Sequence, residues 1–409
     1  MANEAGPLTG LKIIDLTRVI AGPYGAQILG DLGADVIKVE RLGEGDDIRR
    51  VGPPWVIPPR DDRLGESTYF QAVNRNKRSV AVDFAKPAGA ALIREMARQA
   101  DVLLENYRTG TLARYGLGFD DLRKENPALI YCSITGFGQT GPYKDRSGYD
   151  YLVQGMAGMM SVTGLPDGEP GAGPMRAGIP VADILSGMNA VIGVLAALEH
   201  RRRTGEGQHV DISLFDSQAA ALLNTASAWL NAGVTLGRTG NDHPSAAPYG
   251  VYEADDGYLI VATFNDREFA RLAKALGRPE WIDDPRFARN GDRVKHRPEL
   301  KRLVAEALRG KTRAQWVAIL NDATVSAGPI NGVDDMEKDE HAVARELFVT
   351  MQSPAYGTVR SVASPLRLSA TPPNYRRPPP VLGEHTEEVL EEFGISAELL
   401  TQLKAEGAI

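Results

Sequence analysis

From residue 11 to residue 40 the chain reads LKIIDLTRVIAGPYGAQILGDLGADVIKVE. Two apolar runs in it, Leu11–Leu16 and Asp35–Glu40, have the length and composition of buried strands. Between them a turn of small residues, Ala21–Ala26, opens a segment that we expect to be helical over about Pro23–Leu32. A strand, a helix and a second apolar strand in this order predict a βαβ unit, whose two strands are parallel.

The same alternation continues to about residue 135. Further strands are expected at Ser79–Phe84, Val102–Asn106 and Leu129–Thr135. Helices fit between the strands at Ala88–Gln99 and from Leu112–Arg114 onward. Short apolar strands separated by helices predict an α/β fold with a mostly parallel sheet that is covered on both faces. The sequence contains neither Gly-x-Gly-x-x-Gly nor a P-loop pattern, so a standard dinucleotide or P-loop site is weakly supported.

Beyond residue 136 the chain is rich in Gly and Pro up to residue 180, and long irregular segments of this kind are usually functional. A buried apolar helix is expected at about residues 184–203, followed by a strand at His209–Leu214 and a helix at Phe215–Asn231.

The pattern changes again from Tyr252 onward. A strand around Tyr258–Ala262 and several amphipathic helices indicate a smaller α+β module. These helices are expected at Asp266–Leu276, Pro298–Leu308 and Thr312–Asp322. Residues 355–382 are Pro-rich and suit an extended strap across another domain or another subunit, and Ser396–Glu406 is expected to be a short helix.

The composition is that of an ordinary globular enzyme. The chain has 409 residues, of which 43% are hydrophobic, and a net charge of -7. The acidic balance argues against nucleic acid as a partner. We find no run that approaches the roughly 18 to 20 uncharged apolar residues of a membrane span, so we expect no membrane partner.

Cysteine and histidine usage points to a protein without a disulfide or a metal. Cys132 is the single cysteine and lies in an expected buried strand, and the six histidines show no metal-ligand spacing. The N-terminal Met1-Ala2-Asn3-Glu4 does not begin a secretory signal, so we expect a cytoplasmic location.

Asp183 is the most informative single residue. It follows the Gly/Pro-rich segment and opens the apolar run Met188–Leu198. A carboxylate in this position is either a helix N-cap or a nucleophile held in a dry, narrow place.

Ten separated motifs occur in one order along the chain. They are Gly10–Thr17, Ala21–Pro23, Leu32–Glu40, Asn76–Ser79, Leu104–Gly110, Asn126–Pro127, Thr135–Pro142, Gly148–Asp150, Thr204–Gln208 and Leu382–Thr386. In these motifs the chain resembles the class III coenzyme A transferases, the family of formyl-CoA transferase and carnitine-CoA transferase, almost from end to end. The resemblance places Asp183 at the catalytic aspartate of the family.

The resemblance implies an architecture as well as a reaction. It implies a large domain with a Rossmann-like sheet, formed by residues 1–225 and completed by a wrapping segment at residues 331–409. A smaller α+β domain at residues 226–330 would be inserted between them. It also implies a homodimer in which the two chains are interlocked like links.

The implied reaction moves coenzyme A between an acyl-CoA and a small carboxylic acid through an aspartyl-CoA thioester, with the CoA thioester as substrate and no permanently bound cofactor. Arg41 and Arg114 match positions that hold the CoA nucleotide phosphates, a role that suits guanidinium groups. Asn106 and Lys38 are weaker candidates along the CoA channel. Ala21 matches a position where the backbone approaches pantetheine.

Tyr149 matches an active-site tyrosine of formyl-CoA transferase and is followed by Asp150; the alternative is that Tyr149 simply packs at a strand end. Ile20 and Arg18 depart from that enzyme, where a glutamine and a histidine stand. Its tetraglycine loop also has no counterpart, so oxalate and formyl-CoA are disfavoured as substrates.

The chain looks closer to the branch that acts on succinyl-CoA and small dicarboxylic acids. An arginine near the acyl pocket would suit a second substrate carboxylate. The candidates, which the sequence does not rank, are Arg18, Arg49, Arg50, Arg75 and Arg146.

Two alternatives stay open. The α-methylacyl-CoA racemases share the fold and the aspartate but pair it with a histidine in a Gly-His-Asp motif, where this chain has Gly148-Tyr149-Asp150. Tyrosine titrates near pH 10, so it is a poor proton-transfer partner at neutral pH. A CoA-binding protein without turnover is the second alternative, and the presence of Asp183 argues against it.

Overall fold

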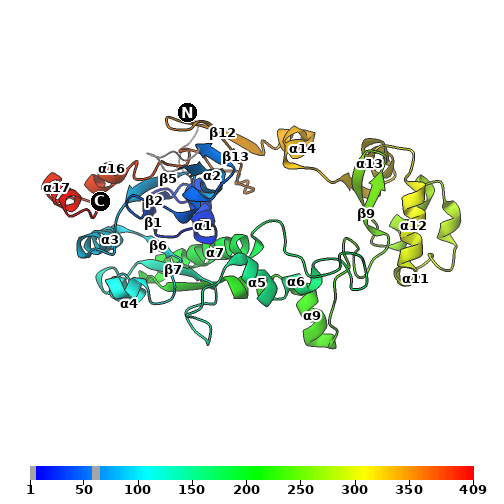
Figure 1. Ribbon diagram of the computed structural model, residues 1–409, viewed down its shortest axis with the longest axis horizontal. Helices are drawn as coiled ribbons and strands as arrows, with labels where there is room; N and C mark the ends of the chain where they lie inside the picture. The colour runs from blue at the N-terminus through cyan, green and yellow to red at the C-terminus, as the bar shows by residue number, and fades with distance from the viewer. Residues whose placement is uncertain (1–5, 58–64) are drawn as a thin grey trace. The chain divides into compact units, whose positions relative to one another are not determined.

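The computed structural model describes residues 6–57 and 65–409, so the N-terminal tetrapeptide lies outside the described residues. Its largest sheet has the strand order β5-β2-β1-β6-β7-β8, and every neighbouring pair is parallel (Figure 1). These strands are β1 (Lys12–Asp15), β2 (Asp35–Glu40), β5 (Lys77–Ala81), β6 (Val102–Glu105), β7 (Ile130–Thr135) and β8 (His209–Ser213). The α/β fold with a parallel sheet is confirmed, in the order typical of doubly wound folds.

The first βαβ unit forms as the sequence predicts. Helix α1 (Ala21–Asp31) connects β1 to β2, and the two strands pair in parallel with Ile13 opposite Val36. The connection returns through Gly33, whose φ of +106° is a conformation that glycine adopts without strain. The carboxyl ends of β1 and β2 therefore lie at the same edge of the sheet.

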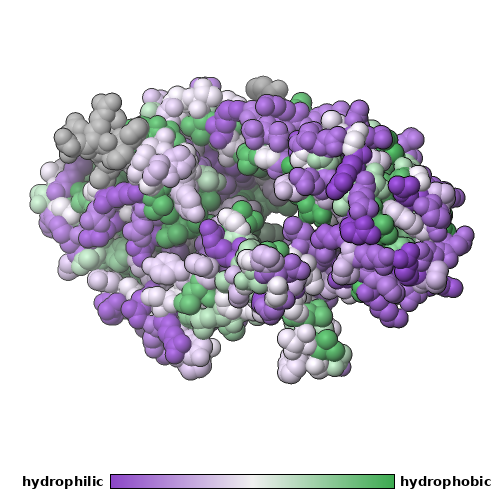
Figure 2. Space-filling view, turned by 45° about the vertical axis from the view of Figure 1, so that its right-hand side comes forward, coloured by the Kyte–Doolittle hydropathy of each residue, from purple (hydrophilic) through white to green (hydrophobic). Residues whose placement is uncertain are grey.

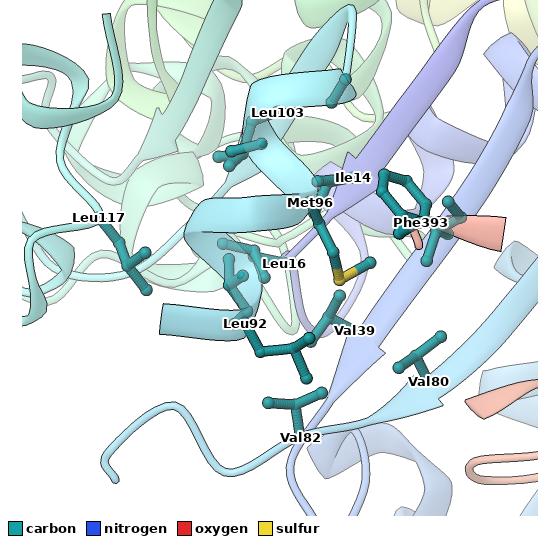
Figure 3. Packing of buried hydrophobic residues seen from close by; sticks show 14 of the residues in the cluster. Ile14, Leu16, Val39, Val80, Val82, Leu92, Met96, Leu103, Leu117 and Phe393 are labelled. Carbon is teal, nitrogen blue, oxygen red and sulfur yellow. The ribbon is translucent and has the colours of Figure 1, made fainter. Parts of the chain in front are cut away.

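One face of the sheet packs against α3 (Pro87–Gln99), α16 (Thr386–Glu392) and α17 (Ala397–Ala405). Figure 3 shows side chains of α3 meeting strand residues and Phe393, which follows α16. The labelled residues are Ile14, Leu16, Val39, Val80, Val82, Leu92, Met96, Leu103, Leu117 and Phe393. Each fully buried side chain of this kind adds roughly 1.5–3 kcal/mol to the free energy of unfolding relative to an exposed one, so this cluster is a main source of stability.

Helices α1 and α7 (Val181–Thr204) pack against each other and contribute to the core on the opposite face. Gly25 and Gly187 make their approach possible. A Cβ atom on Gly187 would lie 2.6 Å from the carbonyl oxygen of Ala21, and one on Gly25 would lie 2.9 Å from that of Gly187. Larger residues at these two positions would push the two helices apart.

Two expectations about α7 need correction. By length and composition α7 could cross a membrane, although no such run was expected. It is also only partly buried: Ala190 and Val194 face the core, whereas Met188 and Ile192 are exposed. The small residues on its buried face pack against α1.

The chain divides into two compact units, which are described separately. The first comprises residues 1–159, 177–227 and 341–409, and the second comprises residues 160–176 and 228–340. Residues 160–176 thus group with the second unit, although they lie within residues 1–225, which the resemblance implies for the large domain.

The second unit is built on an antiparallel sheet of β9 (Tyr249–Ala254), β10 (Gly257–Ala262) and β11 (Ser326–Pro329). The longer helices of this unit are α10 (Asp266–Ala275), α12 (Arg297–Ala307) and α13 (Arg313–Asp322). Apolar residues of the helices and strands share one core. The predicted helices are present, whereas β9 extends into the expected polar loop.

The C-terminal segment returns to the first unit. It contains α15 (Glu340–Ala344) and a hairpin of β12 (Phe348–Ser353) and β13 (Gly357–Val362). The following extended stretch lies on this unit, where the backbone N–H of Asn374 donates to the carbonyl of Asp31 at 2.9 Å. The strap expected at residues 355–382 therefore begins as a hairpin strand and then runs along its own chain.

The remaining elements are short. They are η1 (Asp47–Arg50), β3 (Trp55–Ile57), β4 (Glu66–Ser67), α2 (Thr68–Val73), η2 (Leu112–Tyr115), α4 (Phe119–Glu125), α5 (Asp150–Met156), α6 (Met159–Val162), α8 (Leu214–Ala220), α9 (Leu223–Ala232), η3 (Pro279–Ile282), α11 (Asn290–Lys295) and α14 (Val333–Lys338). The single helix expected at residues 215–231 is divided into α8 and α9, at a point where Leu223 has a φ of +41°.

Candidate active site

A cavity of about 290 Å³ lies at the carboxyl edge of the six-stranded sheet. Its wall includes Arg18, Asn106 and Thr135, which lie at or just beyond the carboxyl ends of β1, β6 and β7. From β1 the chain first adds β2 and β5 on one side and then β6, β7 and β8 on the other side. The direction in which strands are added therefore switches between β1 and β6. In open parallel sheets ligands bind at this switch point, so the cavity is the leading candidate for the active site.

Four helices begin at this cavity. Ala21, Asp150 and Leu214 are the first residues of α1, α5 and α8, and Asp183 lies in the first turn of α7. The first N–H groups of a helix have no partner within the helix and carry partial positive charge. Together the four helix starts favour negative charge in the cavity, including charge that develops on an oxygen during a reaction.

Asp150, rather than Asp183, caps α7. The backbone N–H groups of Ala182 and Asp183 donate to Oδ1 of Asp150, at 2.7 and 3.3 Å. The N-cap position of α7 is Pro180, which provides no side-chain hydrogen bond. The interpretation of Asp183 as an N-cap is therefore wrong, and the carboxylate of Asp183 is available at the cavity wall.

Gln154 holds the Asp150 carboxylate in this position. Its side chain is fully buried, and its Nε2 donates to Oδ2 of Asp150 at 2.6 Å. Its Oε1 accepts the backbone N–H of Ala177 at 2.9 Å. The amide thus ties α5 to the segment that leads into α7.

Asp183 is a weak acid for an aspartate. Burial, and after it the nearby Asp150 carboxylate, raise the pKa of Asp183 from 3.8 to about 7. A carboxylate with a raised pKa is more basic and retains little solvation, which suits a nucleophile. Perturbed carboxylates in a cavity are typical of functional sites.

Asn106 shapes the cavity wall through the backbone. Its side chain accepts the N–H of Arg18 at 2.8 Å and donates to the carbonyl of Arg18 at 2.7 Å. It lines the cavity together with Ala21, and the expected role of both residues in CoA binding stays a prediction.

Lys38 lies elsewhere. Its side chain is fully buried beneath the cavity wall, where Nζ donates to Asp46 and to the carbonyl of Thr17, each at 2.9 Å. The expectation that Lys38 lines the CoA channel does not fit this position, because its ammonium group is occupied within the protein.

Positive side chains line part of the cavity. Arg18 forms an ion pair with Asp47 at 3.0 Å and lies over the ring of Tyr107. The other basic residues of the wall are Arg108, Lys144 and Arg146. This set suits an anionic substrate.

The structure separates the five arginine candidates for a second carboxylate. Arg49 is buried between Glu40 and Glu66, and Arg75 is buried against Asp31. Arg50 is not part of the cavity wall, whereas Arg18 and Arg146 are.

Arg41 and Arg114, expected at the CoA nucleotide, do not line the cavity. Arg41 is exposed and pairs with Glu44 at 2.6 Å, and Arg114 is exposed in η2. Both follow carboxyl ends of strands of the same sheet, β2 and β6. Their role at the nucleotide stays a prediction.

Tyr149 lines the cavity and is 72% exposed, so it does not pack as a strand-end core residue. Among the described residues of the wall there is no histidine. Within residues 6–57 and 65–409 there is also no group of three or more His, Cys, Asp or Glu residues suited to a metal ion.

Sequence reasoning missed several residues of the site. Arg108, Lys144 and Asp47 belong to the wall, and Gln154 orients Asp150. Arg108 lies three residues beyond the carboxyl end of β6, which is a detectable signal. The others depend on how loops and helices fold back over the sheet.

Residues 8–386 match the family described as CoA-transferase family III. The chain is 47% identical over 394 residues to the succinate–glutarate CoA-transferase of Agrobacterium fabrum, covering 96% of this chain and 97% of that protein. It is 40% identical over 386 residues to the succinyl-CoA:glutarate CoA-transferase of Mus musculus, covering 94% and 86%. The crystal structure of a CAIB/BAIF family protein from Brucella suis is similar with a TM-score of 0.86 and 42% identity, covering 95% of this chain and 100% of that chain. The chain therefore belongs to CoA-transferase family III and is an enzyme of this class.

Proposed function

We propose that this enzyme moves coenzyme A from succinyl-CoA to a small dicarboxylic acid, with glutarate as the first acceptor to test, through a thioester on Asp183. The position of Asp183 carries the proposal: a carboxylate of raised pKa at a cavity where four helices begin. The substrates named for the two relatives support succinyl-CoA and glutarate.

The reaction begins when ionised Asp183 attacks the thioester carbonyl. The carbon–sulfur bond breaks, which gives a mixed anhydride and the CoA thiolate. The thiolate then attacks the Asp183 carbonyl of the anhydride and displaces succinate, leaving an aspartyl-CoA thioester. The acceptor carboxylate attacks that thioester, and the same two steps in reverse produce the acceptor-CoA and ionised Asp183.

Each attack creates negative charge on a carbonyl oxygen. We expect backbone N–H groups at the start of α1, where Ala21 lines the cavity, to be donors for that charge, because those at the start of α7 already bind Asp150. Asp150 is already occupied by the N–H groups of Ala182 and Asp183 and by Gln154, so its role is to raise the basicity of Asp183.

A dicarboxylate needs a partner for its second, unreacting carboxylate. Arg18 and Arg146 are the two sequence candidates that line the cavity, and guanidinium groups bind carboxylates in a bidentate manner. Arg18 is held by Asp47 and Tyr107 and is therefore the better oriented of the two.

The proposed enzyme works as a homodimer in the cytoplasm. Apolar side chains of the first unit are exposed on α5, on α7 and at the start of α9: Tyr151, Leu152, Met156, Met188, Ile192 and Leu223. Figure 2 shows hydrophobic residues on α9, the helix that projects at the lower edge of the view. Exposed apolar surface of this extent is typical of a protein interface, and a second copy of the chain is the proposed partner.

The test is a CoA-transfer assay with succinyl-CoA and glutarate, analysed for glutaryl-CoA and succinate. We expect turnover by the wild type and none by Asp183→Asn, with a monocarboxylate such as butyrate as a weaker acceptor. The proposal fails if no acyl-CoA donor supports transfer. Exchange of the α-proton of a branched acyl-CoA with solvent, without transfer, would favour the racemase reaction instead.

A further inference from the structure

The segment Thr17–Ile20 lies between β1 and α1, and its residues Arg18, Val19 and Ile20 form part of the wall of the cavity that contains Asp183. Side chains hold most of its backbone polar groups. Asp15 accepts the N–H of Thr17 at 2.9 Å, and Lys38 donates to the carbonyl of Thr17 at 2.9 Å. Asn106 bonds both the N–H and the carbonyl of Arg18. The conformation of this loop is therefore fixed by hydrogen bonds from side chains beneath the cavity wall.

Val19 is the strained residue of the loop. Its φ is +68°, in the left-handed region, where a β-branched side chain is a genuine outlier. Its N–H donates to Oδ1 of Asp46 at 3.1 Å. The other oxygen of Asp46 accepts from Lys38, and the side chains of both residues are fully buried. Strain of this kind persists only where the surroundings enforce it.

The strained turn brings Ile20 and Ala21 to the cavity. The carbonyl of Ile20 accepts the N–H of Tyr24 at 2.8 Å, which starts α1 directly after the turn. The loop folds closely on the helix, since a Cβ atom on Gly22 would lie 2.3 Å from the side chain of Thr17. A relaxed, extended Val19 would displace the first turn of α1 and, with it, Ala21, which lines the cavity that contains Asp183.

We propose that Asp46 and Lys38 are positioning residues of the transferase. They hold Val19 in its left-handed conformation and so aim the start of α1 at the substrate of Asp183. This inference rests on the proposed function. A buried ion pair stabilises a fold weakly, because the loss of hydration offsets the attraction of the charges. The hydrogen bond from the N–H of Val19 to Asp46 indicates that the role of the pair is to position the backbone of Val19.

The experiment replaces the pair together, Lys38→Met with Asp46→Ala, so that no single charge is left buried. The kcat, the KM for each substrate and the melting temperature are then measured with succinyl-CoA and glutarate. The same double variant is combined with Val19→Gly and, as a matched control, with Val19→Ala. Glycine adopts a positive φ without a tether, whereas alanine removes the same side chain but keeps the Cβ atom that causes the strain.

We expect the double variant to lower kcat by about 100-fold, as for a displaced catalytic group, with little change in the KM of the acceptor. Val19→Gly should restore kcat by about tenfold in that background and Val19→Ala should not. Equal effects of Gly and Ala would overturn the inference, as would a double variant with wild-type kcat.

The outcomes separate the inference from the proposed function. If the wild type transfers no CoA, the proposed function fails. If the wild type transfers CoA and the glycine rescue is absent, the inference fails alone. Should the double variant not fold, Lys38→Met with Asp46→Asn provides the second test: the amide oxygen still accepts the Val19 N–H and no single charge is left buried, so kcat should fall by less than about tenfold. A loss of about 100-fold in this folded variant would also contradict the tether.

Discussion

Asp150 makes Asp183 a weaker acid, so Asp150→Asn should move activity to lower pH. The pKa of Asp183 rises from 3.8 to about 7, with burial as the larger cause and Asp150 as the second. The Asp150 charge thus accounts for less than half of the rise, and its removal should lower the pKa by about 1. An asparagine oxygen can still accept the N–H groups of Ala182 and Asp183, so the cap of α7 is retained, whereas the hydrogen bond from Gln154 Nε2 is lost.

The nucleophile is the ionised form, so the rate of adduct formation rises with pH through the pKa of Asp183. At pH 6 a fall of the pKa from about 7 to about 6 raises the ionised fraction from about one tenth to about one half, or about fivefold. We would measure single-turnover formation of the CoA adduct by rapid quenching and intact mass, from pH 5 to pH 8.5. Asp47→Asn is the matched control, because Asp47 lines the same cavity but pairs with Arg18. The reasoning is refuted if the acid limb of the pH–rate profile of Asp150→Asn stays near pH 7 or moves to higher pH.

Three further predictions concern stability and specificity. Ionising Asp183 in the fold costs on the order of 4 kcal/mol, about three pKa units at 1.36 kcal/mol each. Below pH 4 Asp183 is protonated in the folded and the unfolded protein and costs no stability. As the pH rises through about 7 the folded protein must ionise it, and the free energy of unfolding falls. Asp183→Asn should therefore stabilise the protein against urea above pH 7 and not at pH 4. A similar gain at both pH values would contradict this account. Gly187→Ala should destabilise the protein by about 1–3 kcal/mol and lower its activity, because the new Cβ would meet the backbone of α1. Gly291→Ala is the control and should change neither, because nothing lies within 4 Å of its Cβ position. Equal melting temperatures of the two variants would exclude the close contact. Arg18→Met or Arg146→Met should raise the KM for glutarate by about tenfold or more and leave the KM for butyrate unchanged. Arg50→Met should leave both KM values unchanged. Equal effects on the two acids would argue against a second-carboxylate role.

The sequence predicts the parallel sheet because each strand and helix has its own local pattern. The strand at Asp35–Glu40 and the helix near Pro23–Leu32 are separated by small residues, and each needs only its neighbours to be identified. The position of Asp183 at a helix start is likewise local. These features account for the expected fold and for the leading site residue.

Other features depend on contacts between distant segments. Asp150 caps α7 across a long loop, so Asp183 could not be distinguished from an N-cap by its own surroundings. Lys38 alternates with apolar residues in β2, and only its pairing with Asp46 shows that its charge is buried. The hairpin of β12 and β13 was not predicted: β12 lies before the Pro-rich stretch 355–382, and β13 lies within it, where the proline content indicated an extended chain.

The central claim is that Asp183 itself carries the coenzyme A. The most direct measurement is the mass of proteolytic peptides after incubation with succinyl-CoA and no acceptor, for the wild type and Asp183→Asn. The account predicts a CoA adduct on the peptide that contains Asp183 in the wild type, its disappearance when glutarate is added, and no adduct in the variant. Turnover without an adduct, or an adduct on another residue, would contradict it.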